Sequence, residues 1–346
     1  MIDIAIQSPR CLDFRQGPPP RQLARGQVLV EVHRVGLCGS DYRLFDGSYS
    51  GPKRYPIRFG HEWAGRIVDL PAKSKFDRNV WVTGDCSKWC GNCDLCRIDK
   101  NLCRGIEKFG ITIDGFSTQY RMIEEKYLYQ DEFNLDARLL ALVEFFAVAF
   151  RGVMYVEREL AAADEVLVLG GGPLGLATYL ILKHHCGISK LKITEPNAGR
   201  IAAAQASLGV HEFSEDLPEP RNEQRSGYEE IGASARYPVV FECAGCAAAV
   251  NMALSLVAKG GTVVNLGITS PSLIRTDLLV TKGVRLQGSI GGTGAFQQAM
   301  RFIAANARVI RGMVTHEFPM EQAQEAFEQT MLCEQRIKAQ LVFRDS

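Results

Sequence analysis

The alternation of apolar and polar residues predicts short strands in the first part of the chain. Residues 27–32 alternate with the period of two that is typical of a half-buried strand, and residues 114–129 predict further strands. Residues 139–149 form an apolar run that predicts a helix, with the carboxylate of Glu144 inside its apolar face. This pattern indicates a β-rich domain at the start of the chain.

Beyond residue 165 the pattern changes, and apolar strands alternate with helices. Predicted strands lie at 166–169, 191–194, 239–243, 262–267, 284–290 and 339–343, and predicted helices at 247–258, 295–305 and 320–330. Alternation of this kind is typical of a doubly wound parallel sheet. The expected fold class is therefore α/β, with a β-rich domain joined to a doubly wound one.

Length and composition narrow the classes of function. The 346 residues suit two domains, and a formal net charge of +1 predicts no general attraction to nucleic acid or to a membrane surface. The N-terminal segment has no long apolar run, so we expect no signal peptide, and the run at 139–150 is too short to span a bilayer. Eleven cysteines, an odd number with metal-like spacings, indicate a reducing, cytoplasmic location and not a disulfide framework.

The strand at 166–169 runs directly into a glycine-rich turn. Gly170, Gly172 and Gly175 match the dinucleotide fingerprint, in which the glycines allow a tight turn, close approach of a pyrophosphate and close packing of the next helix. Glu195 ends the following strand, where a carboxylate would accept from the ribose 2′-hydroxyl and repel a 2′-phosphate. This favours NAD over NADP, although Arg200 nearby would tolerate a phosphate.

Four cysteines within a short stretch form the strongest local signal. Cys90, Cys93, Cys96 and Cys103 provide four thiolates, which is typical of a closed, structural zinc site. An iron–sulfur cluster is the chemical alternative, because similar spacings occur in ferredoxin loops. Cys86 is a spare thiol that is either an alternative ligand or a buried residue.

A second group of metal-ligand types is more dispersed. Cys38, followed by Ser40 and Asp41, precedes His61 and Glu62 by about 20 residues. Sulfur and nitrogen donors with neighbouring carboxylates suit a catalytic zinc that keeps one position open. Asp41 is then a candidate acceptor that fixes the tautomer of His61.

Glu144 has two interpretations. It either faces the metal, or it faces solvent or pairs with Arg151, because a buried unpaired carboxylate is costly.

The order of these motifs resembles the zinc-dependent medium-chain alcohol dehydrogenases from about Val28 to Phe343. The segment around Glu144 is similar to the polyol, threonine and glucose dehydrogenase branch. Residues 60–65 and 78–86 also resemble the cyclitol dehydrogenases of aminoglycoside biosynthesis, the 2-deoxy-scyllo-inosamine dehydrogenases.

The resemblance implies two domains and their site residues. A GroES-like catalytic domain would comprise 1–144 and 297–346, with a structural zinc lobe near 86–104, and a Rossmann domain would comprise 145–296. Two zinc ions per chain are implied, a catalytic one at Cys38, His61 and either Glu62 or Glu144, and a structural one at Cys90, Cys93, Cys96 and Cys103. The implied NAD site contains Gly170, Gly172, Pro173, Leu174, Gly175, Glu195, Arg200, Leu266 and Gly267.

The implied activity is NAD-dependent oxidation of a secondary alcohol such as a polyol, sugar, cyclitol or amino alcohol. Zinc would polarise the alcohol oxygen and Ser40 would relay the proton. Ketone reduction at the same site is an alternative, and so is a non-catalytic NAD-binding redox sensor, although such a sensor would be free to lose Cys38, Ser40 or His61.

Three positions depart from the family pattern. Arg43 stands where the proton relay often ends in histidine, the Cys96–Cys103 spacing is one residue short, and Phe145 replaces a frequent proline.

The expected partners are few. We expect a hydroxylated small-molecule substrate, no nucleic acid and no membrane, and a homodimer or homotetramer that pairs through the edge strand 284–290. The candidate pocket residues are mixed polar and aromatic, namely Tyr42, Tyr49, Phe59, Glu62 and Phe145.

Overall fold

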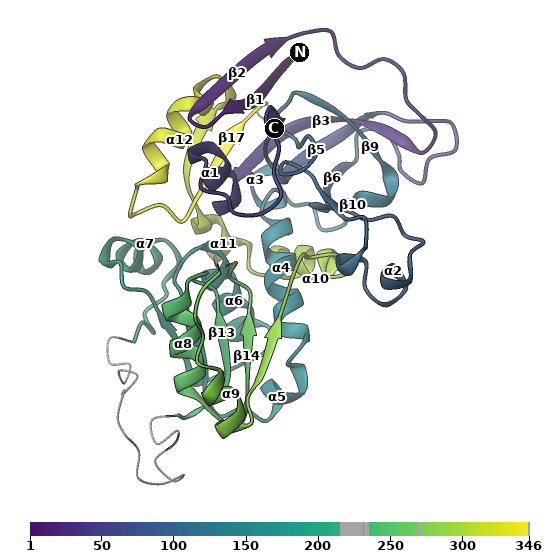
Figure 1. Ribbon diagram of the computed structural model, residues 1–346. Coiled ribbons are helices and arrows are strands. Elements are labelled where there is room, and N and C mark those ends of the chain that lie inside the picture. The colour runs from purple at the N-terminus through teal and green to yellow at the C-terminus, as the bar shows by residue number, and fades with distance from the viewer. Residues whose placement is uncertain (215–230, 232–234, 269–270, 345–346) are drawn as a thin grey trace. The chain divides into compact units, whose positions relative to one another are not determined.

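The structure is a computed structural model that describes residues 1–214, 231, 235–268 and 271–344 (Figure 1). The chain forms two compact units, Met1–Ala147 with Gly291–Ser346, and Val148–Ile290. The sequence placed the divisions after residues 144 and 296. The first boundary of the units falls inside helix α4 (Val143–Met154), which belongs partly to each unit.

A seven-stranded sheet forms the centre of the first unit. Its strand order is β10-β6-β5-β3-β17-β16, and β9 also pairs with β3. The central strand β3 (Gln27–Leu37) alternates between buried and half-buried residues, as the sequence pattern predicts. The other strands are β5 (Glu62–Asp69), β6 (Trp81–Gly84), β9 (Tyr120–Glu124), β10 (Leu128–Gln130), β16 (Val314–Pro319) and β17 (Lys338–Val342).

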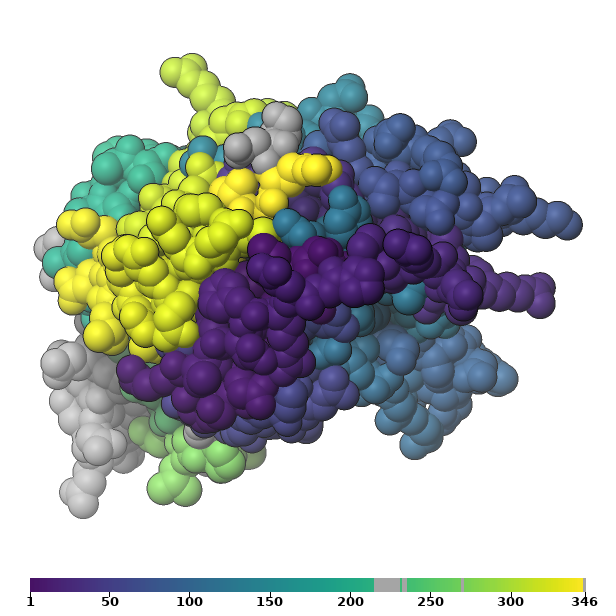
Figure 2. All heavy atoms as spheres, turned by 90° about the horizontal axis from the view of Figure 1, so that it is seen from above, coloured from purple at the N-terminus to yellow at the C-terminus, as the bar shows by residue number. Residues whose placement is uncertain are grey.

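A smaller sheet of order β2-β1-β4 lies at the surface of the same unit, with strands β1 (Ile2–Ser8), β2 (Cys11–Gln16) and β4 (Ile57–Arg58). Figure 2 shows the purple N-terminal strands beside the yellow C-terminal segment. The backbone amide of Leu12 donates to Gln324 in helix α12 (Ala323–Met331) at 3.3 Å, so the two ends of the chain are joined here.

Short helices complete the first unit. A lobe between β7 (Ser87–Lys88) and β8 (Glu107–Lys108) carries α2 (Asp94–Ile98) and the 3₁₀ turn Lys100–Leu102. The other helices are α1 (Gly39–Asp46), α3 (Ala137–Leu140), α10 (Phe296–Ala305) and α11 (Ala307–Ile310), with 3₁₀ turns at Glu125–Tyr127, Arg311–Met313 and Met320–Gln322.

The second unit is a parallel sheet of order β12-β11-β13-β14-β15. A further parallel bridge joins Ile193 to Phe213 beyond β12, which extends the order to the 3-2-1-4-5-6 arrangement of dinucleotide-binding folds. The strands are β11 (Val166–Leu169), β12 (Leu191–Thr194), β13 (Tyr237–Glu242), β14 (Val257–Asn265) and β15 (Arg285–Gly288), and the helices are α5 (Glu157–Ala161), α6 (Pro173–His184), α7 (Ala198–Leu208), α8 (Ala247–Leu256) and α9 (Thr276–Lys282).

The strand order reverses between β11 and β13. Because crossovers between parallel strands are right-handed, α6 and α8 cover opposite faces of the sheet, as a doubly wound fold requires. Ligands of such sheets bind beyond the carboxyl ends of the strands at this reversal. The expected α/β class with a doubly wound domain is confirmed.

Some predicted element boundaries were wrong. The predicted helix at 247–258 ends at Leu256, because Val257 already pairs with Tyr237 in the sheet. The predicted helix at 139–149 is two helices, α3 and α4, with residues 141 and 142 between them. No helix in the described residues is long and apolar enough to cross a membrane.

Candidate functional site

Two adjacent strands of the first unit bring three metal-ligand side chains together. Gly36 of β3 pairs with Glu62 of β5, and Cys38 follows the end of β3 while His61 precedes β5. The ligand atoms of Cys38, His61 and Glu62 lie within 4.8 Å of one another. One sulfur, one nitrogen and one oxygen donor match the protein ligands of a catalytic zinc, which leaves a fourth position for a substrate.

Asp41 holds the two backbones that present these ligands. Its Oδ2 accepts from the amide of Cys38 at 2.9 Å and its Oδ1 accepts from the amide of Gly60 at 3.2 Å, and the carboxylate is fully buried. The expectation that Asp41 accepts from His61 is wrong, since Oδ1 lies 3.9 Å from Nδ1. Asp41 therefore positions the ligand loops and not the imidazole.

The charges around His61 are closely packed. Burial alone would lower the pKa of this imidazole, but the neighbouring groups Cys86, Asp41 and Cys38 raise it well above its usual value. The imidazole therefore lies among sulfur and carboxylate groups, which are donor types that a metal ion binds.

A buried lysine faces Glu62 from the far end of the chain. Lys338 Nζ lies 2.6 Å from Oε1 and 2.5 Å from Oε2 of Glu62, and the two side chains are 3 % and 0 % exposed. The ammonium also lies 4.6 Å from the centre of the Phe145 ring. Sequence reasoning missed Lys338, which begins an apolar strand 276 residues away and carries no local signal of a site.

Glu144 is buried, so the alternative that it faces solvent is wrong. Burial raises the pKa of its carboxyl group to about 7, with the charge of Glu62 adding to the rise and that of His61 opposing it. Glu144 therefore lies close to the metal-ligand group. It is not one of the residues whose ligand atoms cluster within 4.8 Å.

The residues expected around the substrate differ in their surroundings. The hydroxyl of Ser40 is buried and has no hydrogen-bond partner within the described residues, which leaves it available to a bound molecule. Tyr42 is already engaged, since its hydroxyl lies 2.7 Å from Thr330 Oγ1. Phe59 belongs to the core, while Tyr49 is half-buried and Arg43 is exposed on α1.

The four cysteines of the lobe form a second metal-ligand group. Their sulfur atoms lie within 4.8 Å of one another, with Cys90 at 3.8 Å from Cys96 and at 3.6 Å from Cys103. Tetrahedral zinc with bonds of about 2.3 Å places its sulfur ligands about 3.8 Å apart. The geometry therefore fits a structural zinc with Cys103 as the fourth donor.

The surroundings of the thiols differ from one cysteine to the next. Amides of Arg104 and Cys96 lower the pKa of Cys93 to about 6, whereas burial raises that of Cys96 to about 12. A bound cation would hold all four as thiolates. Cys86 is outside this group and is buried, with its sulfur 3.9 Å from the carbonyl of Phe109.

The glycine-rich turn of the second unit has the positive φ and the close backbone contact that the glycine fingerprint predicts. Gly170 has φ of +103°, and a Cβ on Gly175 would lie 1.7 Å from the carbonyl oxygen of Gly170. A Cβ on Gly172 would meet nothing within 4 Å, so the space beside it is open. Pro173 and Leu174 then begin α6, and because proline has no N–H, the first free amides of the helix belong to Leu174 and the residues after it.

Glu195 lies against this turn. Its Oε2 accepts from the amide of Gly171 at 3.0 Å, and the side chain is 4 % exposed. Arg200 Nη1 is 3.6 Å from the same oxygen and its side chain is 43 % exposed. The turn therefore has a buried carboxylate beside it and a partly exposed cation next to that carboxylate, and these residues fit a dinucleotide.

Leu266 and Gly267 follow β14 at the carboxyl edge of the sheet. A Cβ on Gly267 would lie 2.3 Å from the amide nitrogen of Gly245, so only glycine fits there. Glu242, which the sequence places in a strand without a role, accepts through Oε1 from the amides of Ala244 at 2.9 Å and Gly245 at 2.7 Å. Glu242 fixes the loop beside Gly267.

Comparison with known families gives two matches. Residues 24–132 match the alcohol dehydrogenase GroES-like domain, and residues 173–305 match the zinc-binding dehydrogenase domain. Together they span most of the chain and fall in the order that the sequence motifs indicate.

Curated relatives match over most of their length. An L-threonine 3-dehydrogenase of Coxiella burnetii is 29 % identical over 322 residues, 91 % of each chain. A D-arabitol-phosphate dehydrogenase of Enterococcus avium is 28 % identical over 318 residues, 88 % of this chain and 87 % of the relative.

Solved structures share the fold. A zinc-binding dehydrogenase from Sinorhizobium meliloti bound to NADP has a TM-score of 0.81 at 24 % identity, over 99 % of this chain and 98 % of that one. An Escherichia coli alcohol dehydrogenase complexed with NADH has a TM-score of 0.85 at 21 % identity, over 99 % of each chain.

Proposed function

The chain belongs to the zinc-binding dehydrogenases that carry an alcohol dehydrogenase GroES-like domain, and on this premise we propose that it oxidises a secondary alcohol with NAD⁺. The observation that carries the proposal is the group formed by Cys38, His61 and Glu62, whose ligand atoms lie within 4.8 Å of one another. The substrate class is a hydroxylated small molecule, namely a polyol, sugar, cyclitol or amino alcohol.

Cys38, His61 and Glu62 hold the catalytic zinc in this proposal. Glu62 is preferred to Glu144 because its oxygen belongs to the cluster of ligand atoms. A carboxylate oxygen has enough lone pairs to accept from Lys338 and bind a metal ion at the same time. Glu144 is then a buried carboxyl group near the metal-ligand group and not a ligand. The four-cysteine lobe holds the second, structural zinc.

The bound metal would polarise the substrate hydroxyl as a Lewis acid, and the nicotinamide would take the hydride. The chain's own residues transfer the proton of the substrate hydroxyl. Ser40 Oγ, which is buried without a protein partner in the described chain, accepts from the substrate hydroxyl and passes the proton on. Arg43 stays protonated and is no base, so the relay continues to water. The reverse reduction of a ketone uses the same groups.

The relatives support the class of substrate. The two curated proteins are named for L-threonine and D-arabitol phosphate, which are both hydroxylated. Tyr49 is half-buried and lies near enough to His61 and Cys38 for their charges to act on its hydroxyl, which it would offer to such a molecule. A long alkyl chain would leave polar groups such as the buried Ser40 hydroxyl unpaired, which is costly.

The test is formation of NADH by the zinc-loaded protein, followed at 340 nm, against polyols, cyclitols, amino alcohols and simple secondary alcohols. We expect turnover with at least one hydroxylated class, and loss of turnover after zinc is removed with a chelator. Ketones with NADH test the reverse direction. No turnover in either direction, with zinc confirmed present, would favour the non-catalytic NAD-binding sensor.

Glu195 should determine the preference for NAD⁺. Its carboxylate repels a 2′-phosphate, so we expect kcat/KM for NAD⁺ to exceed that for NADP⁺ by roughly a hundredfold. In Glu195→Gln that ratio should fall by at least about tenfold, since the charge is removed while the amide oxygen still accepts from Gly171 and only the hydrogen bond from the Asn197 amide is lost. Glu212→Gln, at a half-buried ion pair with Lys183 in the same unit, is the control. An unchanged ratio in Glu195→Gln would contradict the role assigned to this carboxylate.

A further inference from the structure

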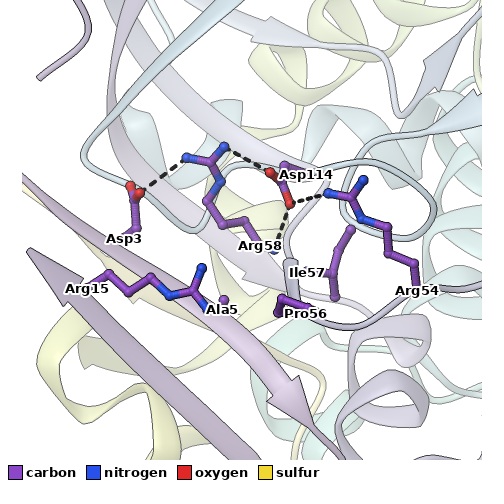
Figure 3. A pocket seen from close by; sticks show the side chains of 8 residues that line it. All are labelled: Asp3, Ala5, Arg15, Arg54, Pro56, Ile57, Arg58 and Asp114. Carbon is purple, nitrogen blue, oxygen red and sulfur yellow. Dashed lines mark hydrogen bonds and ion pairs between the residues drawn. The ribbon is translucent and has the colours of Figure 1, made fainter. Parts of the chain in front are cut away.

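A cavity of about 250 Å³ in the first unit is lined by three arginine side chains that take no part in the zinc or dinucleotide sites (Figure 3). Arg15 comes from β2, Arg54 precedes β4 and Arg58 ends β4. The other lining residues are Asp3, Ala5, Pro56, Ile57 and Asp114. The cavity therefore lies against the small sheet β2-β1-β4.

Positive charge exceeds negative charge on the cavity wall, where three guanidinium groups face two carboxylates. Asp114 accepts from Arg54 at 3.2 Å and from Arg58 at 2.9 Å, and Asp3 lies 3.3 Å from Arg58 (Figure 3). The backbone amide of Arg58 also donates to Asp114 at 3.2 Å. Asp114 therefore contacts two arginines at once, and Arg58 is shared between Asp114 and Asp3.

Two of the guanidinium groups keep donors for a ligand. Arg54 is 53 % exposed, and within the described residues its side chain makes only the contact to Asp114. Arg15 is 49 % exposed and uses Nε for Asp13 and Nη2 for Gln7. A guanidinium group has five N–H donors, so both arginines have several left.

A fourth arginine, Arg121, does not line the cavity but contacts the lining residue Asp114. Arg121 donates from Nη2 to the backbone carbonyl of Asp114 at 2.9 Å, and its buried Nε has no partner within the described part of the chain. Burial and the charge of Arg58 lower the pKa of Arg121 to about 10. The arginines are therefore close enough to repel one another, and an added anion would relieve this repulsion.

We propose that this cavity binds a phosphate group through Arg15, Arg54 and Arg58. The planar fork of arginine matches the oxygens of phosphate and binds them in pairs. The cavity volume lies just below the range of about 300–1,000 Å³ that is usual for drug-sized ligands, so the proposal concerns a small ligand. The ligand is a free phosphate ion or a small phosphate monoester.

The test is calorimetric titration of the zinc-loaded protein with inorganic phosphate and, separately, with glycerol 2-phosphate, at an ionic strength held constant with KCl. We expect Arg54→Gln and Arg15→Gln each to weaken binding by about tenfold or more, because each removes charge-assisted hydrogen bonds. Tighter binding of glycerol 2-phosphate identifies a monoester as the ligand, and tighter binding of phosphate identifies the free ion.

Arg78→Gln is the matched control. Arg78 is also exposed and paired with a carboxylate, Asp69 at 2.6 Å, and its side chain is not part of the cavity. Arg54→Gln removes a partner of Asp114 and could disturb the hydrogen bonds of that carboxylate. Arg15→Gln is the second variant because Arg15 pairs with Asp13 and Gln7, so its loss leaves the hydrogen bonds of Asp114 in place. Phosphate bound at the zinc or at the glycine-rich turn would persist in all variants. Binding that is equal in wild type, Arg15→Gln and Arg54→Gln would overturn the proposal.

Discussion

His61→Ala should lower kcat/KM for alcohol oxidation by at least about a thousandfold, because a catalytic zinc with three protein ligands loses one of them. His61 is 4 % exposed and its ligand atoms lie within 4.8 Å of those of Cys38 and Glu62. The same variant should lose one of two zinc equivalents while the four-cysteine lobe keeps the other. NADH formation and zinc content by mass spectrometry measure the two effects together.

The control for this variant is His211→Ala. His211 is exposed in the second unit, and within the described part of the chain its hydrogen bond is from the backbone amide to Glu212 at 3.0 Å. We expect its activity and zinc content to equal those of the wild type. Retention of both zinc equivalents and of the rate in His61→Ala would exclude the assigned ligand group.

Lys338→Met should destabilise the protein by about 3–5 kcal/mol, because it leaves the carboxylate of Glu62 buried without its partner. The exposed fractions of 3 % and 0 % leave almost no access for water to take the place of the ammonium. Urea unfolding of the zinc-free protein measures this free energy without a contribution from the metal.

Two further variants test whether the loss of stability comes from the burial of Glu62 and not from the loss of any lysine charge. Lys126→Met breaks an exposed pair with Glu124, whose atoms are 2.8 Å apart, and should cost at most about 1 kcal/mol. Glu62→Met combined with Lys338→Met should recover most of the lost stability, since an apolar pair needs no compensation. A cost below about 1 kcal/mol for Lys338→Met alone would show that Glu62 does not depend on this lysine.

The expected dimer or tetramer through residues 284–290 stays a prediction. Strand β15 does lie at an edge of the described sheet, where its free side has backbone donors and acceptors.

The glycine-rich turn and the cysteine lobe were predictable from the sequence because their geometry is local. Gly170 needs a positive φ and Gly175 needs contact with a residue five positions away, so the spacing itself encodes the turn. The four cysteines lie within one loop, and their spacing brings the sulfurs together without help from the rest of the fold. The alternation of strands and helices gave the doubly wound sheet for a similar reason.

Which residues form the metal-ligand group of the first unit became clear only from the tertiary structure. Cys38 and His61 meet because β3 pairs with β5, and the sequence contains the ligand types but not this register. Asp41 turned out to hold two backbones and not the imidazole, since its oxygens face the amides of Cys38 and Gly60.

Lys338 is the clearest case of a residue whose role could not be predicted from the sequence. The sequence by itself determined the fold class, the dinucleotide turn, the cysteine lobe and most of the candidate ligands. Only the tertiary structure decided that Lys338 meets Glu62 across 276 residues, that Cys86 stays outside the cysteine group and that Glu144 is buried. The physical reason is that local spacing fixes backbone turns, whereas partners of buried charges are chosen by the packing of the whole core.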